Sequence, residues 1–166
     1  MEIVAHWRMP ITFVAALGCG LVAGVFFAFS TFVMSALAQQ PPAQGIATMQ
    51  SINITVINPW FMTAFLGTGA TCLLLVLVSL FQWQQPGTAY VLIGALLYLV
   101  GTFSITIAFN VPLNNALAVA KPGSSESTDL WVSYLTNWTT WNHVRTIAAL
   151  TAATFLTLSL CDRILK

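Results

Sequence analysis

The chain has 166 residues, of which 58% are hydrophobic and only 5% are charged, and its formal net charge is +1. Soluble globular domains usually contain about 25% charged residues, so this composition excludes a soluble globule and predicts an integral membrane protein. Its five basic residues are too few to form a positive surface that neutralises phosphate groups. We therefore expect no nucleic-acid partner.

Four apolar stretches are long enough to cross a bilayer as helices, since a hydrocarbon core of ~30 Å requires about 20 residues. They cover about residues 11–37, 59–81, 89–110 and 141–160. We predict an all-α fold, a four-transmembrane-helix bundle that forms a single integral membrane domain over residues 1–166. Ala36-Leu37-Ala38 resembles a signal-peptidase site, but the apolar stretch before it is longer than the ~7–15 residues of a signal sequence. We expect this stretch to remain as an anchor.

The first span contains residue types that favour close packing. Gly20 and Gly24 have the spacing that lets another helix backbone approach, and Gly18 precedes them. These glycine faces either permit a homo-oligomer or are used inside the bundle. Four phenylalanines follow, and they either wall an apolar pocket or face lipid and neighbouring helices: Phe26, Phe27, Phe29 and Phe32.

A short amphipathic interfacial helix is predicted between the first and second spans, over about residues 43–58. It contains no basic residue that could hold anionic lipid, so we expect it to fold back on the bundle. Asn58 and Pro59 then predict an N-cap followed by proline at the first helical position of the second span.

The third span is expected to break or kink at Val111, because Pro112 disfavours helical geometry in the residue before it. Asn110 either satisfies the backbone groups of this break or contributes to a site. Asn114 either caps a short helix over residues 116–120 or contributes to the same site. Gly94 and Gly101 predict close packing of this span against another helix.

An extended fourth helix is predicted from about Asp129 onward, with Ser127 or Thr128 as its N-cap. Apolar and aromatic residues recur along it at intervals of three and four. At helical pitch, four of its side chains share one face, and they combine two indoles, an amide and a guanidinium: Trp138, Trp141, Asn142 and Arg145.

Arg145 lies inside the fourth span, because the apolar run after it is only about 15 residues long and a span needs about 20. Arginine at mid-bilayer costs at least ~2.5–3.5 kcal/mol. No spanning segment contains a carboxylate before Asp162. The partner of Arg145 must then be Glu126, Asp129, amide or backbone oxygens, water or a bound anion. Arg145 therefore either snorkels to the interface or stabilises an anion.

Polar side chains converge on the outer third of the predicted bundle. His143 lies roughly 100° around the helix from Asn142 and is either an isolated histidine with local hydrogen bonds or a general base. The complete set is Asn53, Asn58, Asn110, Asn114, Asn142, His143 and Arg145.

Neither a disulfide framework nor a metal site is expected. Cys19, Cys72 and Cys161 lie far apart within apolar segments, and an odd number without close spacing indicates packing residues. His6 and His143 belong to opposite ends of the bundle, so they are not expected to share a metal ion.

The few basic residues predict the orientation of the bundle. Arg8, Arg163 and Lys166 fall on one side of a four-span chain, whereas Lys121 falls in the opposite loop and Arg145 near that same face. Because lysine and arginine gather in cytoplasmic loops, we predict a multi-pass protein with both termini in the cytoplasm.

Four motifs occur in order over almost the whole chain: Met49-Gln50-Ser51-Ile52-Asn53, Asn58-Pro59-Trp60-Phe61, Asn110-Val111-Pro112-Leu113-Asn114 and Trp138-Thr139-Thr140-Trp141-Asn142-His143-Val144-Arg145-Thr146. In these motifs the chain resembles the anthrone-oxygenase-like family of small four-helix integral membrane proteins. The resemblance implies oxidation of an anthrone, a polyketide-derived tricyclic ketone, to an anthraquinone. Molecular oxygen would be the oxidant, and no cofactor is implied.

The resemblance also implies roles for individual residues. Arg145 would hold the substrate anion, in a water-poor site where such donors act strongly. His143 is the candidate base, and the indoles would stack on the flat substrate. The residues that would position or bind the substrate are Asn53, Asn110, Asn114, Trp138, Trp141 and Asn142.

A second hypothesis is a non-enzymatic membrane protein that binds lipid or quinone, or an accessory subunit of a larger membrane complex. In this case the tryptophans form an aromatic belt and Arg145 meets a lipid headgroup. A third hypothesis is haem or copper binding through His143. The first hypothesis predicts a hydrophobic small-molecule substrate and molecular oxygen as partners.

Overall fold

The computed structural model describes the backbone of residues 2–164 and the side chains of residues 7–162. All of its regular elements are helices. The first part of the chain contains α1 (Glu2–Ala28), the π-helical η1 (Phe29–Val33), α2 (Met34–Ala38), α3 (Pro42–Thr55) and α4 (Pro59–Phe81). The second part contains α5 (Thr88–Leu96), the π-helical η2 (Leu97–Ser104) and η3 (Thr106–Asn110), α6 (Val111–Ala118) and α7 (Ser125–Ile164).

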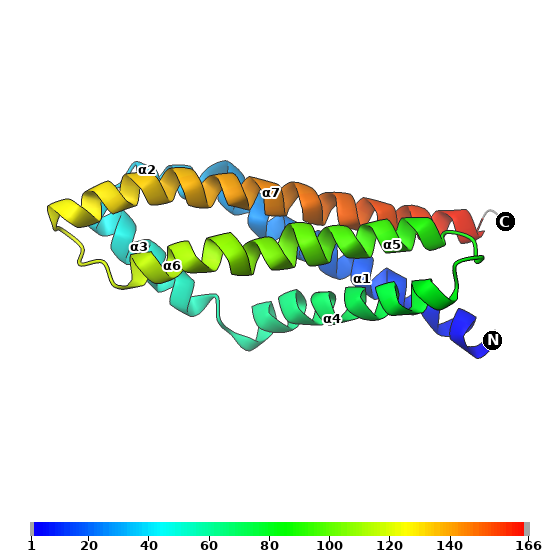
Figure 1. The fold of residues 1–166 in the computed structure, drawn as a ribbon. Helices are drawn as coiled ribbons and strands as arrows, with labels where there is room; N and C mark the ends of the chain where they lie inside the picture. Colours follow the sequence, from blue (N-terminus) through cyan, green and yellow to red (C-terminus); the bar gives the residue numbers. More distant parts are fainter. Residues whose placement is uncertain (1, 165–166) are drawn as a thin grey trace.

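The predicted all-α bundle of four transmembrane helices is confirmed. Four continuous helical segments are long and apolar enough to cross a membrane: Trp7–Ala38, Pro59–Phe81, Thr88–Ala118 and Ser125–Asp162. The protein is therefore a multi-pass membrane protein. Figure 1 shows α7 along the whole length of the bundle, with α5 and α6 beside it, and shows that α1 begins at the end of the bundle where α7 ends.

Of the predicted break or kink at Val111, the break is wrong. Asn110 (φ −74°, ψ −39°) and Val111 (φ −63°, ψ −45°) both have right-handed helical geometry, and the Val111 N–H donates to the carbonyl of Thr106, five residues earlier. Pro112 has no N–H to donate to the preceding turn, and the π-helical turns of η2 and η3, which come just before it, widen the helix there. The suggested helix over residues 116–120, capped by Asn114, is also wrong, because Asn114 lies inside α6.

Helix α3 packs on the rest of the bundle, as its lack of basic residues predicted. The side-chain nitrogen of Gln50 donates to the carbonyls of Leu117, at 2.8 Å, and Ala120, at 3.0 Å. Leu117 lies in the last turn of α6 and Ala120 lies two residues after its end, where helical donors become scarce; the Leu117 carbonyl also accepts from the Ala120 N–H at 3.1 Å. Gln50 thus ties α3 to α6 by satisfying the end of a neighbouring helix.

The predicted N-cap of the second span is confirmed. The side-chain oxygen of Asn58 accepts hydrogen bonds from the backbone N–H groups of Trp60, at 3.1 Å, and Phe61, at 3.0 Å. Pro59 is the first residue of α4. The cap sets the direction in which α4 leaves the short loop after α3.

The long fourth helix is confirmed, but it begins at Ser125, four residues before Asp129. Ser124 caps it, since its hydroxyl accepts from the Ser127 N–H at 3.2 Å. Ser127 and Thr128 do not act as caps, because their hydroxyls donate to the Ser124 carbonyl instead. The cap lies one turn earlier because the polar residues before Asp129 continue the helix.

Helices pack closely at three of the five glycines named above. A Cβ atom at Gly18 would collide with the side chain of Thr68, and one at Gly101 would lie 2.5 Å from Ala148. Gly94 packs against Leu156 in the same way. Gly20 and Gly24 meet nothing within 4 Å, so their spacing does not mark a contact inside the bundle. The prediction is confirmed for Gly94 and Gly101 and wrong for the Gly20–Gly24 pair as an internal contact.

Two apolar clusters form the core. One joins α1, α4, α5 and α7 near the chain ends and includes Phe26, Phe65 and Tyr98. The other joins α2, α3, α6 and the first half of α7 and includes Met49 and Trp138. Residues of both clusters line the cavity described below, which therefore lies where the two clusters meet.

Candidate functional site

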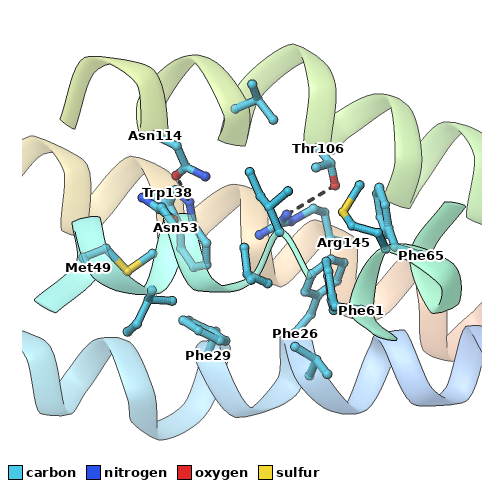
Figure 2. Close-up of a pocket in the computed structure, with 16 residues that line it drawn as sticks. Phe26, Phe29, Met49, Asn53, Phe61, Phe65, Thr106, Asn114, Trp138 and Arg145 are labelled. Atoms are coloured by element: carbon cyan, nitrogen blue, oxygen red, sulfur yellow. Dashed lines mark hydrogen bonds between the residues drawn. The ribbon is translucent and has the colours of Figure 1, made fainter. Parts of the chain in front are cut away.

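A cavity of about 230 Å³ lies under α3, between α1, α4, the third span and α7. Most of its wall is aliphatic or aromatic, and its polar side chains are two amides, one threonine hydroxyl and a guanidinium (Figure 2). The lining residues are Val25, Phe26, Phe29, Met49, Ile52, Asn53, Val56, Ile57, Phe61, Met62, Phe65, Thr106, Val111, Asn114, Trp138 and Arg145.

Arg145 is the charged residue of this wall, and its side chain is only 4% exposed. Its Nη2 atom donates to Oδ1 of Asn142 at 2.7 Å, and its Nη1 atom donates to Oγ1 of Thr106 at 3.2 Å. No carboxylate lies among the described residues that line the cavity or that accept these hydrogen bonds. The guanidinium therefore faces the cavity with neutral partners only.

Aromatic rings surround the charge. The guanidinium carbon of Arg145 lies 4.1 Å from the ring centroid of Phe26 and 5.1 Å from that of Trp138. Rings at these distances attract a cation through their negative faces. The predicted snorkelling to the interface does not describe this side chain, because the guanidinium is buried between rings of α1 and α7.

Asn142 lies behind Arg145 rather than in the cavity wall. Its Nδ2 atom donates to the Phe26 carbonyl and to the Ser30 hydroxyl, both at 2.7 Å. Its Oδ1 atom is then free to accept from Arg145. Asn142 is fully buried and therefore orients the guanidinium, which makes it a positioning residue in this geometry.

Asn114 of α6 and Trp138 of α7 meet on the side of the cavity that the second core cluster forms. Oδ1 of Asn114 accepts from Nε1 of Trp138 and from the Tyr134 hydroxyl, each at 2.8 Å. Asn53 of α3 lines the same side and lies beside the same tyrosine hydroxyl. Three predicted site residues, Asn53, Asn114 and Trp138, therefore come together here.

Asn110 braces two helices next to the cavity. It is 1% exposed, and its Nδ2 atom donates to the Trp138 carbonyl at 3.1 Å. This hydrogen bond joins Asn110 to a carbonyl of the neighbouring helix α7. Asn110 does not line the cavity, and its effect on the site passes through the placement of Trp138.

Trp141 and His143 are not brought to the cavity. The Trp141 ring stacks on Phe109, with centroids 3.6 Å apart and planes 14° apart. His143 is exposed on the outer side of α7. Each residue of a helix turns by about 100°, so the residue after the buried Asn142 already points outward.

Several residues of the site were not singled out from the sequence. Thr106 and Tyr134 supply hydrogen bonds, and Phe61 and Phe65 belong to the cavity wall. Thr106 lies four residues before Asn110, a helical spacing that could have indicated it. Of the two alternatives for the first-span phenylalanines, Phe26 and Phe29 follow the pocket alternative, whereas Phe27 and Phe32 are exposed.

The polar groups of the wall are poor metal ligands. Neutral amide and hydroxyl oxygens bind metal ions weakly. A guanidinium has no lone pair to offer a metal ion, and its positive charge repels cations. Among the described residues, no three histidine, cysteine, aspartate or glutamate side chains come together. What this wall favours is an anion, held by a charge-assisted hydrogen bond in surroundings of low dielectric constant.

The family model of anthrone oxygenase matches residues 60–155, which is more than half of the chain. No curated protein and no solved structure matches. The matched residues run from α4 through most of α7 and contain Asn114, Trp138 and Arg145. The wall that α1 and α3 contribute lies outside the match, although Phe26 and Asn53 line the same cavity. The resemblance seen in the sequence is confirmed, and the chain belongs to the anthrone oxygenase family.

Proposed function

We propose that this protein is a membrane oxygenase that oxidises a flat, acidic, anthrone-like ketone with molecular oxygen in the cavity beneath α3. The observation that carries the proposal is Arg145, a buried guanidinium that faces an aromatic cavity and whose hydrogen-bond partners are neutral. An arginine side chain keeps its charge in proteins. Its charge is therefore available to a ligand anion.

The cavity supports a compact ring system as the ligand. Its volume of about 230 Å³ is below the ~300–1,000 Å³ of usual ligand pockets, so a lipid with two acyl chains does not fit inside it. Phe26, Phe29 and Trp138 offer rings to a flat substrate. A substrate of this kind also enters from the bilayer more readily than from water.

The reaction balances with oxygen as the only co-substrate. The central ring of an anthrone loses a proton from its CH₂ group, and the resulting phenolate-like anion reduces O₂. One oxygen atom becomes bonded to that carbon and remains as the second carbonyl of the quinone. The other oxygen atom leaves as water with the two hydrogens of the CH₂ group.

In this reaction Arg145 would bind the oxygen on which the negative charge gathers. Stabilising that charge lowers the cost of losing the proton, because a preorganised donor acts most strongly where water is scarce. Thr106 and Asn142 would hold the guanidinium in place. In this mechanism water that reaches the cavity accepts the proton. His143 takes no part, because its side chain is exposed on the outer side of α7.

The test is oxygen uptake and quinone absorbance with purified protein and an anthrone, using Arg145→Gln and Arg145→Lys. Removing one oxyanion donor typically lowers kcat by about 10²–10³, and we expect this loss for Arg145→Gln. Arg145→Lys keeps the charge but loses the planar guanidinium, so its kcat should lie between those of the wild-type protein and Arg145→Gln. Lys121→Gln is the matched control, because it removes the same charge from an exposed loop.

Thermal stability in detergent shows whether each variant is folded. A folded Arg145→Gln protein with full activity contradicts the proposal. Binding of an anthrone or quinone by the wild-type protein without turnover supports a non-enzymatic binder of the same ligand instead.

A further inference from the structure

The orientation of the Asn114 amide is determined by its two neighbours. The indole Nε1 of Trp138 can only donate a hydrogen bond, and it lies 2.8 Å from the atom of Asn114 assigned as oxygen. A flipped amide would bring two donors together at this distance. The Tyr134 hydroxyl, also at 2.8 Å, uses the second lone pair of the same oxygen. The NH₂ group of Asn114 must therefore point the other way.

This NH₂ group belongs to a residue of the cavity wall. Figure 2 shows the oxygen of Asn114 against Trp138 and its nitrogen turned away from that contact. An amide held in this manner offers hydrogen-bond donors and no acceptor to a ligand. Tyr134 and Trp138 act through Asn114 as positioning residues.

Asn114 and Arg145 are separate polar groups of the cavity wall and can bind different atoms of one ligand. The guanidinium carbon of Arg145 lies 5.1 Å from the ring centroid of Trp138, and Oδ1 of Asn114 lies 2.8 Å from Nε1 of the same ring, so the two groups are separate in Figure 2. Between them the wall is formed by apolar side chains such as Phe29 and Ile52. A ligand that contacts both groups is an apolar ring system that carries two oxygen atoms.

We propose that Asn114 is a specificity-determining residue, which donates a hydrogen bond to an uncharged acceptor oxygen of the ligand, separate from the oxygen that Arg145 binds. For the identity of the ligand this inference rests on the proposed function. The preferred substrate is then a fused tricyclic ketone that carries an oxygen substituent on a terminal ring, in addition to the oxygen that becomes charged.

The experiment compares two ligands that differ only in this substituent, an unsubstituted anthrone and an anthrone with one hydroxyl on a terminal ring. Binding is measured without oxygen by quenching of tryptophan fluorescence, and turnover is measured in air. The variants are Asn114→Asp, which keeps an oxygen for Tyr134 and Trp138 but loses the NH₂ donor, and Asn114→Leu. The controls are Asn115→Asp and Asn115→Leu, at an exposed neighbouring position outside the cavity wall.

We expect the wild-type protein and both Asn115 variants to prefer the hydroxylated ligand by at least about tenfold, since a site built to bond a hydroxyl discriminates against its absence. Both Asn114 variants should lose this preference, because their affinity for the hydroxylated ligand falls more than their affinity for the unsubstituted anthrone. In Asn114→Asp the added carboxylate should also weaken the binding of both ligands, since it opposes an anion at Arg145. If Asn114→Leu does not fold, Asn114→Asp carries the test, because it retains both accepted hydrogen bonds.

Persistence of the preference in folded Asn114 variants would overturn the inference, as would an equal loss of affinity for both ligands, which indicates a structural role. Preference in binding without turnover means that the proposed oxygenase activity fails and the role of Asn114 stands. Turnover of both ligands without a preference means that the proposed oxygenase activity stands and the role of Asn114 fails. A wild-type protein that neither binds nor oxidises either ligand contradicts both.

Discussion

The guanidinium of Arg145 donates to the side-chain oxygen of Asn142, three residues earlier on α7, at 2.7 Å. This partner is neutral, so the contact orients the guanidinium without cancelling its charge. A carboxylate in the same place would make an ion pair.

Asn142→Asp should lower kcat/KM for an anthrone by about 10-fold or more, because a carboxylate next to Arg145 opposes the binding of a second anion. The oxygen that accepts from Arg145 is kept, but the Nδ2 donor to the Phe26 carbonyl and the Ser30 hydroxyl is lost, so the melting temperature should fall and is measured beside the activity. Steady-state oxygen uptake measures the effect. Asn137→Asp, at an exposed position of the same helix, controls for an added charge. Unchanged kcat/KM in the Asn142 variant would show that the charge of Arg145 is not used for an anion.

Gln50→Leu should loosen α3 by removing the two hydrogen bonds to the end of α6. Losing these two hydrogen bonds should cost about 1–3 kcal/mol of stability in total, at about 0.5–1.5 kcal/mol each, although the Leu117 carbonyl keeps the Ala120 N–H as a donor. Faster hydrogen exchange over α3 and a lower melting temperature in detergent are the expected results. Gln44→Leu, on the exposed side of the same helix, should behave as wild type. Equal exchange rates in the two variants would mean that Gln50 does not hold α3.

Gly18→Ala should destabilise the contact between α1 and α4, because the added methyl group meets Thr68. Overpacking of this kind usually costs about 1–3 kcal/mol. Gly20→Ala adds the same methyl group where nothing lies within 4 Å and should change the melting temperature little. The pair separates packing from helix propensity, and a similar melting temperature for both variants would contradict the close approach at Gly18.

His143→Ala should retain the activity of the wild-type protein within about twofold, since substitutions of exposed side chains away from a site have small effects. Initial rates of quinone formation test this directly. A loss of a hundredfold or more, the scale of general-base catalysis, would restore the histidine as the base and require α7 to turn toward the cavity. Binding of haem or copper by His143 would be seen in the absorption spectrum of the wild-type protein and lost in this variant.

The sequence by itself determined the membrane-spanning architecture and the most informative site residue. Hydropathy is a local property, and lipid requires each span to satisfy its own backbone hydrogen bonds as a helix, so the second span coincides with α4 at both ends. The Asn58 cap is local for the same reason. Arg145 was visible as a charge within an apolar stretch, and its burial in a cavity wall agrees with that.

Only the tertiary structure decided which side chains share the cavity with Arg145. Membrane helices are apolar on nearly all sides, so their sequences carry little information about which face points inward. A turn of about 100° per residue separates the buried Asn142 from the exposed His143. The same geometry leaves Trp138 in the cavity wall and stacks Trp141 on Phe109.

The rest of the site depends on contacts between segments far apart in the chain. Phe26, Thr106 and Asn114 come from three different elements and meet α7 only through packing. The helix that continues through Pro112 is also a tertiary outcome, since π-helical turns compensate for a residue that locally favours a break. The sequence thus determined the spans and the charge, and the packing of the spans decided which neutral partners surround that charge.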